Sequence, residues 1–179
     1  MKYIVLDLEA TCWKDREVKK PNEIIEIGAL KIDENGQILS EFSAFVQPKL
    51  HPVLSDFCKE LTTISQAEID TADDYSTVIH AFQDWINLDE DYYLCSWGFY
   101  DKSQFKKDND LHNLDSRWLK NHISIKHQHG EIKKLRRPIG MVAALKLEKL
   151  SLEGTHHRGI DDARNIAKIF LANFGEWKF

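Results

Sequence analysis

The strongest constraint on the fold is an apolar run near the N-terminus that is interrupted by acidic residues. Tyr3–Leu8 has the sequence YIVLDL, a β-branched and aromatic stretch typical of a strand that is buried on both faces. Such a strand belongs near the centre of a sheet. Because side chains alternate along a strand, we expect Asp7 and Glu9 on one face and Leu6 and Leu8 on the other. The fold must then bring two carboxylates into one small volume.

Other periodic segments predict a mixed sheet with helices packed on it. The segments Ile24–Ile32 and Leu39–Val46 flank an Asn35-Gly36 pair, which tolerates the positive φ of a tight turn, so we expect two antiparallel strands. Tyr92–Trp97 predicts a fourth strand. Apolar residues at helical spacing predict helices over Tyr75–Leu88, Gly140–Leu150 and Asp161–Phe174, and Asp101–Leu111 resembles the start of another helix. This order indicates an α/β domain.

The size of the chain predicts one domain over residues 1–179. With 179 residues, of which 42% are hydrophobic, the chain can bury one sizeable core. No apolar run approaches the roughly 18 residues that cross a bilayer, and the N-terminus lacks the pattern of an export signal. Cys12, Cys58 and Cys95 are odd in number and form no CxxC motif, so we expect reduced thiols and a cytoplasmic location without a membrane partner.

The net charge of −5 argues at first against a polyanionic partner. If four carboxylates bind cations, however, the rest of the chain is nearly neutral. Basic residues also gather in three groups, at Lys14–Lys20, Lys102–Lys107 and Lys126–Arg137, although a solvated surface is the alternative interpretation of each. We expect Asn113–Pro138 to be an irregular, mobile surface segment that approaches a substrate.

The pair Asp7 and Glu9 predicts a cation site at the end of the first strand. Two neighbouring carboxylates raise each other's pKa unless a cation lies between them, and Mg²⁺ prefers oxygen ligands. The small residues Ala10 and Thr11 follow and let a ligand approach the backbone. A lone Asp-x-Glu motif is weak evidence, because several arise by chance among 29 acidic residues and most are solvated.

A further carboxylate lies at the end of the fourth strand. Asp101 ends the sequence SWGFYD, at the junction of a strand and a helix and beside a glycine and three aromatic residues. A helix N-cap is the alternative role for Asp101, since Asp is common at that position.

The third acidic segment, Gly154–Asp162, opens the last predicted helix. We expect Asp161 to cap this helix while Asp162 points elsewhere. An imidazole near Asp162 can accept a proton from a metal-activated water, and His157 lies five residues before it. A surface histidine without such a role is the alternative. The spacing of His156 and Asp161 is the same, so spacing alone leaves the register open.

Together these segments resemble the three motifs of the DEDDh subgroup of the DnaQ-like 3′-to-5′ exonucleases. The resemblance is nearest to the Eri-like branch, and it rests on DLEATC from Asp7, EIIEIG from Glu23 and HRGIDDARNI from His157. It implies an RNase H-like five-stranded sheet and two ions, Mg²⁺ or Mn²⁺. The family pattern places Ala after the metal-binding Asp, which favours the pair His157 and Asp162.

The resemblance also implies roles for individual residues. Asp7 would bridge both ions, Glu9 and Asp162 would complete the site on the nucleophile side, Asp101 would hold the leaving-group side, and His157 would be the general base. The substrate would be a nucleic acid with a free 3′ end, RNA or DNA, with RNA preferred. A nucleic-acid-binding module without catalysis and a partner-docking protein are the rival interpretations.

The resemblance extends to substrate contacts. Backbone groups of Ala10 and Thr11 would recognise the terminal 3′-hydroxyl, and Leu61 would wedge against the terminal base. Trp97 would stack on a base, with core packing as its alternative role. Thr63 replaces the glycine of the family's Leu-Thr-Gly-Ile sequence.

Overall fold

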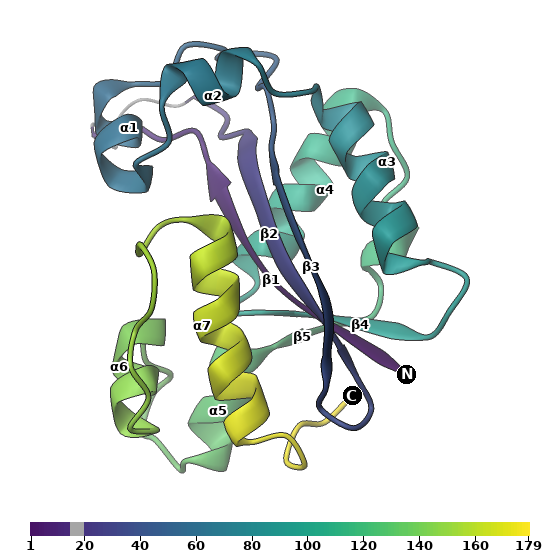
Figure 1. The fold of residues 1–179 in the computed structure, drawn as a ribbon, viewed down its shortest axis with the longest axis vertical. Coiled ribbons are helices and arrows are strands. Elements are labelled where there is room, and N and C mark those ends of the chain that lie inside the picture. Colours follow the sequence, from purple (N-terminus) through teal and green to yellow (C-terminus); the bar gives the residue numbers. More distant parts are fainter. Residues whose placement is uncertain (15–19) are drawn as a thin grey trace.

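A mixed five-stranded sheet forms the centre of the molecule (Figure 1). The computed structural model describes residues 1–14 and 20–179, and its strand order is β3-β2-β1-β4-β5. β1 pairs antiparallel with β2 and parallel with β4. The predicted mixed sheet is confirmed, with its first strand in the middle. The strands are β1 (Lys2–Ala10), β2 (Ile24–Asp33), β3 (Ile38–Phe45), β4 (Tyr92–Ser96) and β5 (His122–Ser124).

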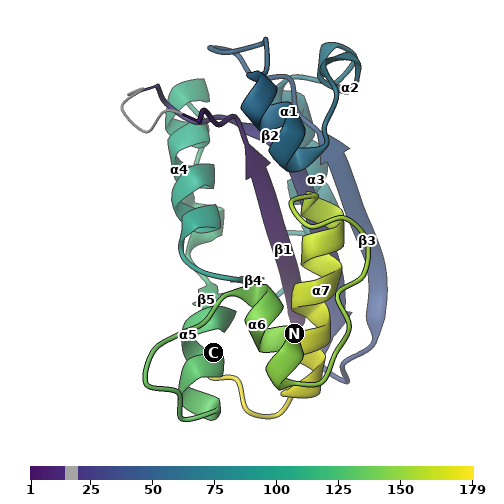
Figure 2. The same ribbon diagram turned by 90° about the vertical axis from the view of Figure 1, so that its left-hand side faces the viewer.

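Helices cover both faces of this sheet (Figure 2). α3 and α4 pack on one face, while α6 and α7 pack on the other. The short helices α1 and α2 lie near the end of β1 and share a smaller apolar cluster. The helices are α1 (Asp56–Thr62), α2 (Gln66–Asp70), α3 (Tyr75–Ile86), α4 (Tyr100–His112), the 3-10 helix η1 (Arg117–Leu119), α5 (Ile125–Ile132), α6 (Met141–Leu147) and α7 (Gly159–Ala172).

The alternation of β1 divides its side chains between the two faces. Leu6 and Leu8 are buried against α3 and α4, whereas Val5 is buried in the cluster that includes α7. Asp7 and Glu9 continue the Val5 row and therefore point to the α7 side of the sheet. The predicted division between the two faces is thus present in the structure.

The hairpin between β2 and β3 forms at the predicted turn. Gly36 has a φ of 79°, and its N–H donates to the carbonyl of Asp33 at 3.1 Å. The Asp33 carboxylate also accepts the Asn35 N–H at 2.9 Å. The positive φ explains why a glycine follows the asparagine.

The expectation of an irregular surface segment over Asn113–Pro138 is wrong. This stretch contains η1, the edge strand β5 and helix α5, and it buries Trp118, Ile123 and Ile125 in the two main apolar clusters. A strand of three residues is too short to show a period of two. The elements are real but too brief to be recognised from hydrophobic spacing.

The structure tests the remaining sequence predictions only in part. Arg16 and Lys19, part of the first basic group, lie outside the described residues. Within residues 1–14 and 20–179, no helix combines the length and apolar character that a membrane span requires. The single domain over the whole chain and the cytoplasmic location stay predictions.

Candidate active site

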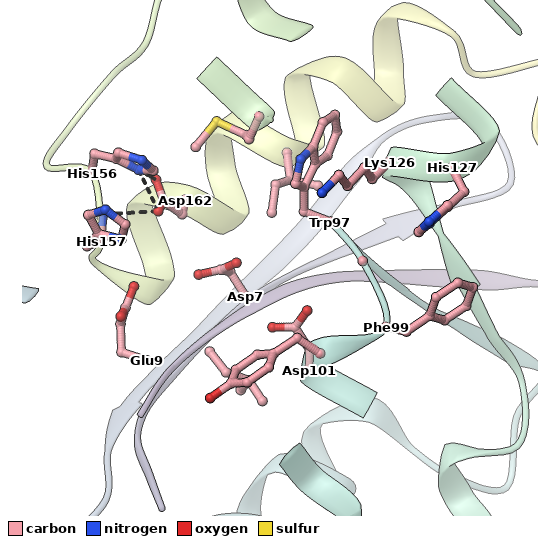
Figure 3. A pocket seen from close by; sticks show the side chains of 15 residues that line it. Asp7, Glu9, Trp97, Phe99, Asp101, Lys126, His127, His156, His157 and Asp162 are labelled. Carbon is pink, nitrogen blue, oxygen red and sulfur yellow. Dashed lines mark hydrogen bonds and ion pairs between the residues drawn. The ribbon is translucent and has the colours of Figure 1, made fainter. Parts of the chain in front are cut away.

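A pocket of about 460 Å³ opens at the end of β1, between α7, the start of α4 and α5 (Figure 3). Side chains from segments far apart in the sequence meet in it. The carboxylates proposed from the sequence all line this pocket, as do both histidines of the last loop. Its lining residues are Asp7, Leu8, Glu9, Trp97, Gly98, Phe99, Tyr100, Asp101, Lys126, His127, Met141, His156, His157, Asp162 and Ile166.

Three of the four carboxylates form a tight group. One ligand atom each from Asp7, Glu9 and Asp162 lies within 4.8 Å of the others. Asp101 completes the acidic lining from the start of α4. The sheet brings Asp7 and Glu9 together, and the packing of α7 on β1 adds Asp162.

The pKa values of these acids are raised by their surroundings. Burial raises the pKa of Asp7 well above its ordinary value, and the charges of Asp101 and Glu9 raise it further. Burial, followed by the charge of Asp162, raises the pKa of Glu9 to about 8. Carboxylates that repel one another at such short distances form a favourable binding site for a cation.

Asp101 does not cap its helix. Phe99 occupies the N-cap position of α4, and Asp101 lies in the first turn, 4% exposed. Burial raises its pKa to about 6. The residue lines the pocket and does not occupy the N-cap position.

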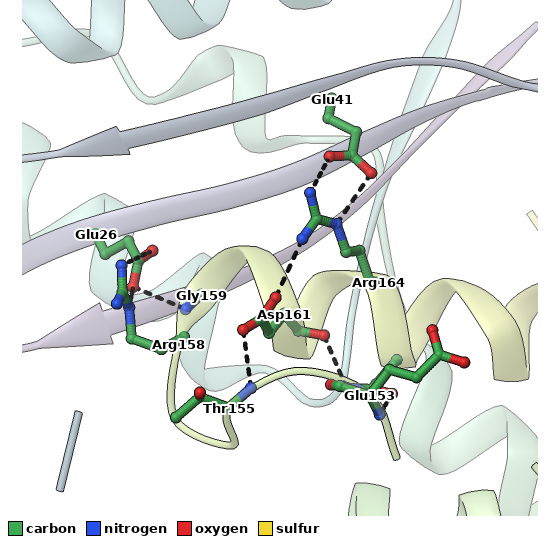
Figure 4. A network of polar contacts seen from close by, with 9 residues as sticks. Glu26, Glu41, Glu153, Thr155, Arg158, Gly159, Asp161 and Arg164 are labelled. Atoms are coloured by element: carbon green, nitrogen blue, oxygen red, sulfur yellow. Dashed lines mark hydrogen bonds and ion pairs between the residues drawn. The ribbon is translucent and has the colours of Figure 1, made fainter. Parts of the chain in front are cut away.

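Asp161 and Asp162 point in different directions, but Asp161 is not the cap of α7. Arg158 occupies the N-cap position without a capping side chain, so the predicted cap is wrong. The Asp161 carboxylate instead accepts the N–H of Thr155 at 2.8 Å and pairs with Arg164 at 3.1 Å (Figure 4). Asp161 lies too far into the first turn to cap the helix, and it stabilises the preceding loop instead.

The two histidines contact Asp162 in different ways. The Nδ1 atom of His156 lies 2.8 Å from Oδ2 of Asp162, whereas His157 uses its backbone N–H, at 3.0 Å. His157 has a φ of 67°, and its ring stacks on His156 with the centroids 4.0 Å apart. The ring of His157 is thus not engaged by Asp162. Burial, assisted by the charge of His156, lowers the pKa of His157 and favours its neutral form.

The residues predicted to contact the substrate differ in whether they line the pocket. Trp97 lines the pocket, and its buried Nε1 has no hydrogen-bond partner among the described residues. Leu61 lies outside the pocket lining but is 36% exposed on α1. The backbone N–H of Thr11 donates to the carbonyl of Glu23 at 2.8 Å, and the carbonyl of Ala10 accepts the Cys58 thiol at 3.8 Å, so both predicted backbone groups already have protein contacts.

Sequence reasoning missed several residues of this pocket. Lys126 and His127 lie at the start of α5, inside the stretch expected to be irregular. His156, considered only as a register alternative, has the ring that contacts Asp162. Phe99, beside Asp101, stacks on His127 with the ring centroids 5.0 Å apart. The aromatic residues before Asp101 and the basic group that begins at Lys126 were the available signals.

The α7 helix is held against the sheet by a contact that only glycine permits. A Cβ atom on Gly28 would lie 2.2 Å from the backbone of Gly159 and Ile160. The fully buried carboxylate of Glu26 accepts the Gly159 N–H at 2.8 Å and pairs with Arg158 at 3.2 Å (Figure 4). These contacts fix the first turn of α7 and therefore the position of Asp162.

The pocket fits divalent cations by the chemistry of its donors. Carboxylate oxygens from four residues are the ligand type that Mg²⁺ and Mn²⁺ prefer. No protein group among the described residues donates a hydrogen bond to the carboxylates of Asp7 or Glu9. Bound cations would supply the positive charge that the protein itself does not.

Comparison with known proteins identifies relatives of the whole fold. The family described as RNase_T: Exonuclease matches residues 4–170. Over 197 residues the chain is 32% identical to the ERI1 exoribonuclease 2 of Xenopus laevis, with 93% of this chain and 27% of that protein covered. Over 175 residues it is 33% identical to the human 3′-5′ exoribonuclease 1, with 92% and 50% covered. The chain thus spans half or less of the length of these curated relatives.

A solved structure resembles this one closely. The crystal structure of the nuclease domain of 3′hExo, described as a DEDDh family member bound to rAMP, superposes with a TM-score of 0.92 and 28% sequence identity. The match covers 97% of this chain and 92% of that one. The expected RNase H-like architecture is confirmed.

Proposed function

The chain belongs to the RNase_T exonuclease family and resembles its DEDDh members, and on that basis we propose that it is a metal-dependent 3′-to-5′ exonuclease. The observation that carries the proposal is the convergence of Asp7, Glu9 and Asp162 within 4.8 Å, with Asp101 and His157 lining the same pocket. The reaction would hydrolyse the last phosphodiester bond of a nucleic acid and release a 5′-mononucleotide.

The four carboxylates would hold two divalent ions, Mg²⁺ or Mn²⁺, with Asp7 shared between them. Bound ions would activate water, neutralise the phosphate and stabilise the departing 3′ oxygen. Glu9 and Asp162 lie on the same side of Asp7 as the two histidines. Asp101 lies on the other side of Asp7 (Figure 3). In this proposal the acids would lie on both sides of a bound phosphate.

His157 would remove the proton of the attacking water. Its lowered pKa keeps the imidazole neutral near pH 7, and its ring is not held by Asp162. His156, by contrast, would release Asp162 when that carboxylate binds a cation. The two neighbouring histidines would therefore differ in their effect on catalysis.

RNA is the proposed substrate class. The named relatives are exoribonucleases, and the similar solved structure is described as bound to rAMP. The Ala10 backbone and Leu61 would receive the terminal nucleotide, because α1 packs beside the end of β1 through a contact from Cys58 Sγ to the Ala10 carbonyl at 3.8 Å. Trp97 would stack on a base within the pocket.

Digestion of 5′-labelled single-stranded RNA and DNA tests this proposal. We expect stepwise shortening from the 3′ end with Mg²⁺ or Mn²⁺, and none in EDTA. His157→Ala should lower kcat by about 10²-fold or more, whereas the neighbouring control His156→Ala should change it far less. Binding without shortening, by folded protein with either metal, would instead support a nucleic-acid-binding module without catalysis.

A further inference from the structure

A second groove lies beside the catalytic pocket, between α4 and η1. Its volume is about 610 Å³, and Phe99 lines both the groove and the pocket. The other lining residues include four basic side chains and no acidic one. The full lining is Phe99, Lys102, Ser103, Lys106, Ser116, Arg117, Leu119 and Lys120.

The basic side chains of the groove are available to an anion. Lys106 pairs with Asp110 and Arg117 pairs with Asp115, each at 2.7 Å, but both pairs are exposed to water. Exposed pairs contribute little and exchange readily for a phosphate. Lys120 is exposed and makes no ion pair within the described part of the chain.

Phe99 connects the groove to the reaction site. It is 57% exposed, and its ring stacks on His127, which also lines the catalytic pocket. An exposed aromatic ring beside a row of cations is the arrangement that binds single-stranded nucleic acid, with bases on the ring and phosphates on the cations. Nothing in the proposed hydrolysis itself uses this ring.

The direction of the substrate also favours this path. If the terminal nucleotide occupies the Ala10 and Leu61 side, the rest of the strand has to leave at the other end of the pocket. Figure 3 shows Phe99 and His127 on the side away from Glu9 and His157. Phe99 immediately precedes α4, whose residues Lys102 and Lys106 line the groove.

We propose that this groove binds the sugar-phosphate backbone of the strand upstream of the scissile bond. The occupant is the single-stranded part of the substrate, held by phosphate contacts from Lys102, Lys106, Arg117 and Lys120 and by base stacking on Phe99. The inference rests on the proposed exonuclease function, because the polarity of the substrate follows from it. The contacts are to phosphates, so the groove contributes affinity without sequence preference.

The test compares two charge-neutralising double variants. Lys102→Gln with Lys120→Gln removes two groove charges, and Lys107→Gln with Lys146→Gln removes two exposed charges that lie outside it. The readout is the ratio of kcat/KM between an RNA of about twelve nucleotides and a dinucleotide, which is too short to reach the groove. We expect the groove variant to lower this ratio about tenfold through KM, and the control variant to leave it unchanged.

A binding measurement separates failure of this inference from failure of the proposed function. Fluorescence anisotropy of the same labelled RNA, in EDTA, reports affinity without cleavage. The groove variant should bind more weakly than the control, and its log Kd should depend on log salt concentration with a slope smaller by about one to two. Equal binding and equal ratios for the two variants would overturn the groove. Absence of cleavage by the unaltered protein would overturn the exonuclease, and anisotropy would then decide the groove alone.

Discussion

Two sets of carboxylates lie on or beside neighbouring strands, and they differ in what surrounds them. Glu26 of β2 and Glu23, which directly precedes that strand, are buried, and protein donors satisfy both. The Glu23 oxygens accept backbone N–H groups of the loop after β3 at 2.6 to 3.0 Å, and Glu26 accepts Gly159 N–H and pairs with Arg158. Asp7 and Glu9 on β1 face mainly other acids.

This difference separates structural acids from acids that need a ligand. A buried carboxylate with enough donors strengthens the fold, because its charge is matched by hydrogen bonds. A buried carboxylate among like charges weakens the fold until a cation arrives. The same residue types therefore predict opposite responses to substitution, to pH and to metal.

The largest expected effect is that of Asp7→Asn on catalysis. The substitution keeps the shape of the side chain but removes the charge shared by both ions, so we expect kcat/KM to fall by about a thousandfold or more. Because the change also relieves repulsion among the carboxylates, the free energy of unfolding of the metal-free protein should rise by about 1 kcal/mol. Hydrolysis of labelled RNA and urea unfolding in EDTA measure the two effects. If the Asp7→Asn variant kept its activity, or were less stable than the unaltered protein in EDTA, Asp7 would not be a carboxylate that needs a bound cation.

The opposite outcome is expected for Glu26→Ala. This change leaves the buried Gly159 N–H and the Arg158 guanidinium without their partner, so we expect a loss of about 3 kcal/mol of stability. Glu26→Gln keeps an oxygen for Gly159 and serves as the matched control, with a smaller loss. Urea unfolding with and without Mg²⁺ measures both. If Glu26→Ala were as stable as the unaltered protein, the claim that Glu26 stabilises the fold would be wrong.

The pH dependence of the metal-free protein is the third prediction. The folded-state pKa of Glu9 is about 8, above its ordinary value of 4.5, so protonation favours the folded state. This contribution is complete below about pH 4.5 and is lost as the pH rises through 8. Asp101, raised to about 6, adds a loss of the same sign at lower pH.

We therefore expect the stability in EDTA to fall by on the order of 2 kcal/mol between about pH 5 and about pH 9. Glu9→Gln should remove the upper part of this fall and is the control for other titrating groups, including His157. With excess Mg²⁺ the stabilisation by metal should grow with pH, because the ligands bind as carboxylates. A flat stability profile in EDTA would argue that the acids are not under mutual repulsion.

The sequence predicted the role of Asp7 and Glu9 but not that of Glu23 and Glu26. Asp7 and Glu9 could be placed on one face because strand alternation is a local rule, and the Asn35-Gly36 turn is local as well. The role of Glu26 and the need for glycine at position 28 depend on the close approach of α7, which no local pattern encodes. The contact between the His156 ring and Asp162 lies next to a left-handed backbone at His157, a conformation that residue spacing does not predict.

The smallest predicted effect distinguishes electrostatic strain from backbone strain. Thr63 ends α1 with a φ of 60°, a left-handed conformation that is costly for a β-branched residue. Its side chain is exposed, so little packing is lost on substitution. Thr63→Gly should therefore stabilise the protein by about 0.5 to 1 kcal/mol, a gain reduced by the greater freedom of glycine in the unfolded chain.

Comparing the stability of each variant with and without Mg²⁺ distinguishes repulsion between carboxylates from strain in the backbone. Cations relieve repulsion among carboxylates but cannot change the φ of Thr63, so the gain from Thr63→Gly should be equal in EDTA and in Mg²⁺, while that from Asp7→Asn should appear in EDTA alone. Thr63→Asn, which tolerates the left-handed conformation without the flexibility of glycine, is the control and should also stabilise. Urea unfolding of all three variants under both conditions measures this. A Thr63→Gly gain that vanished with Mg²⁺ would mean that α1 is coupled to the metal site, and the separation of the two strains would fail.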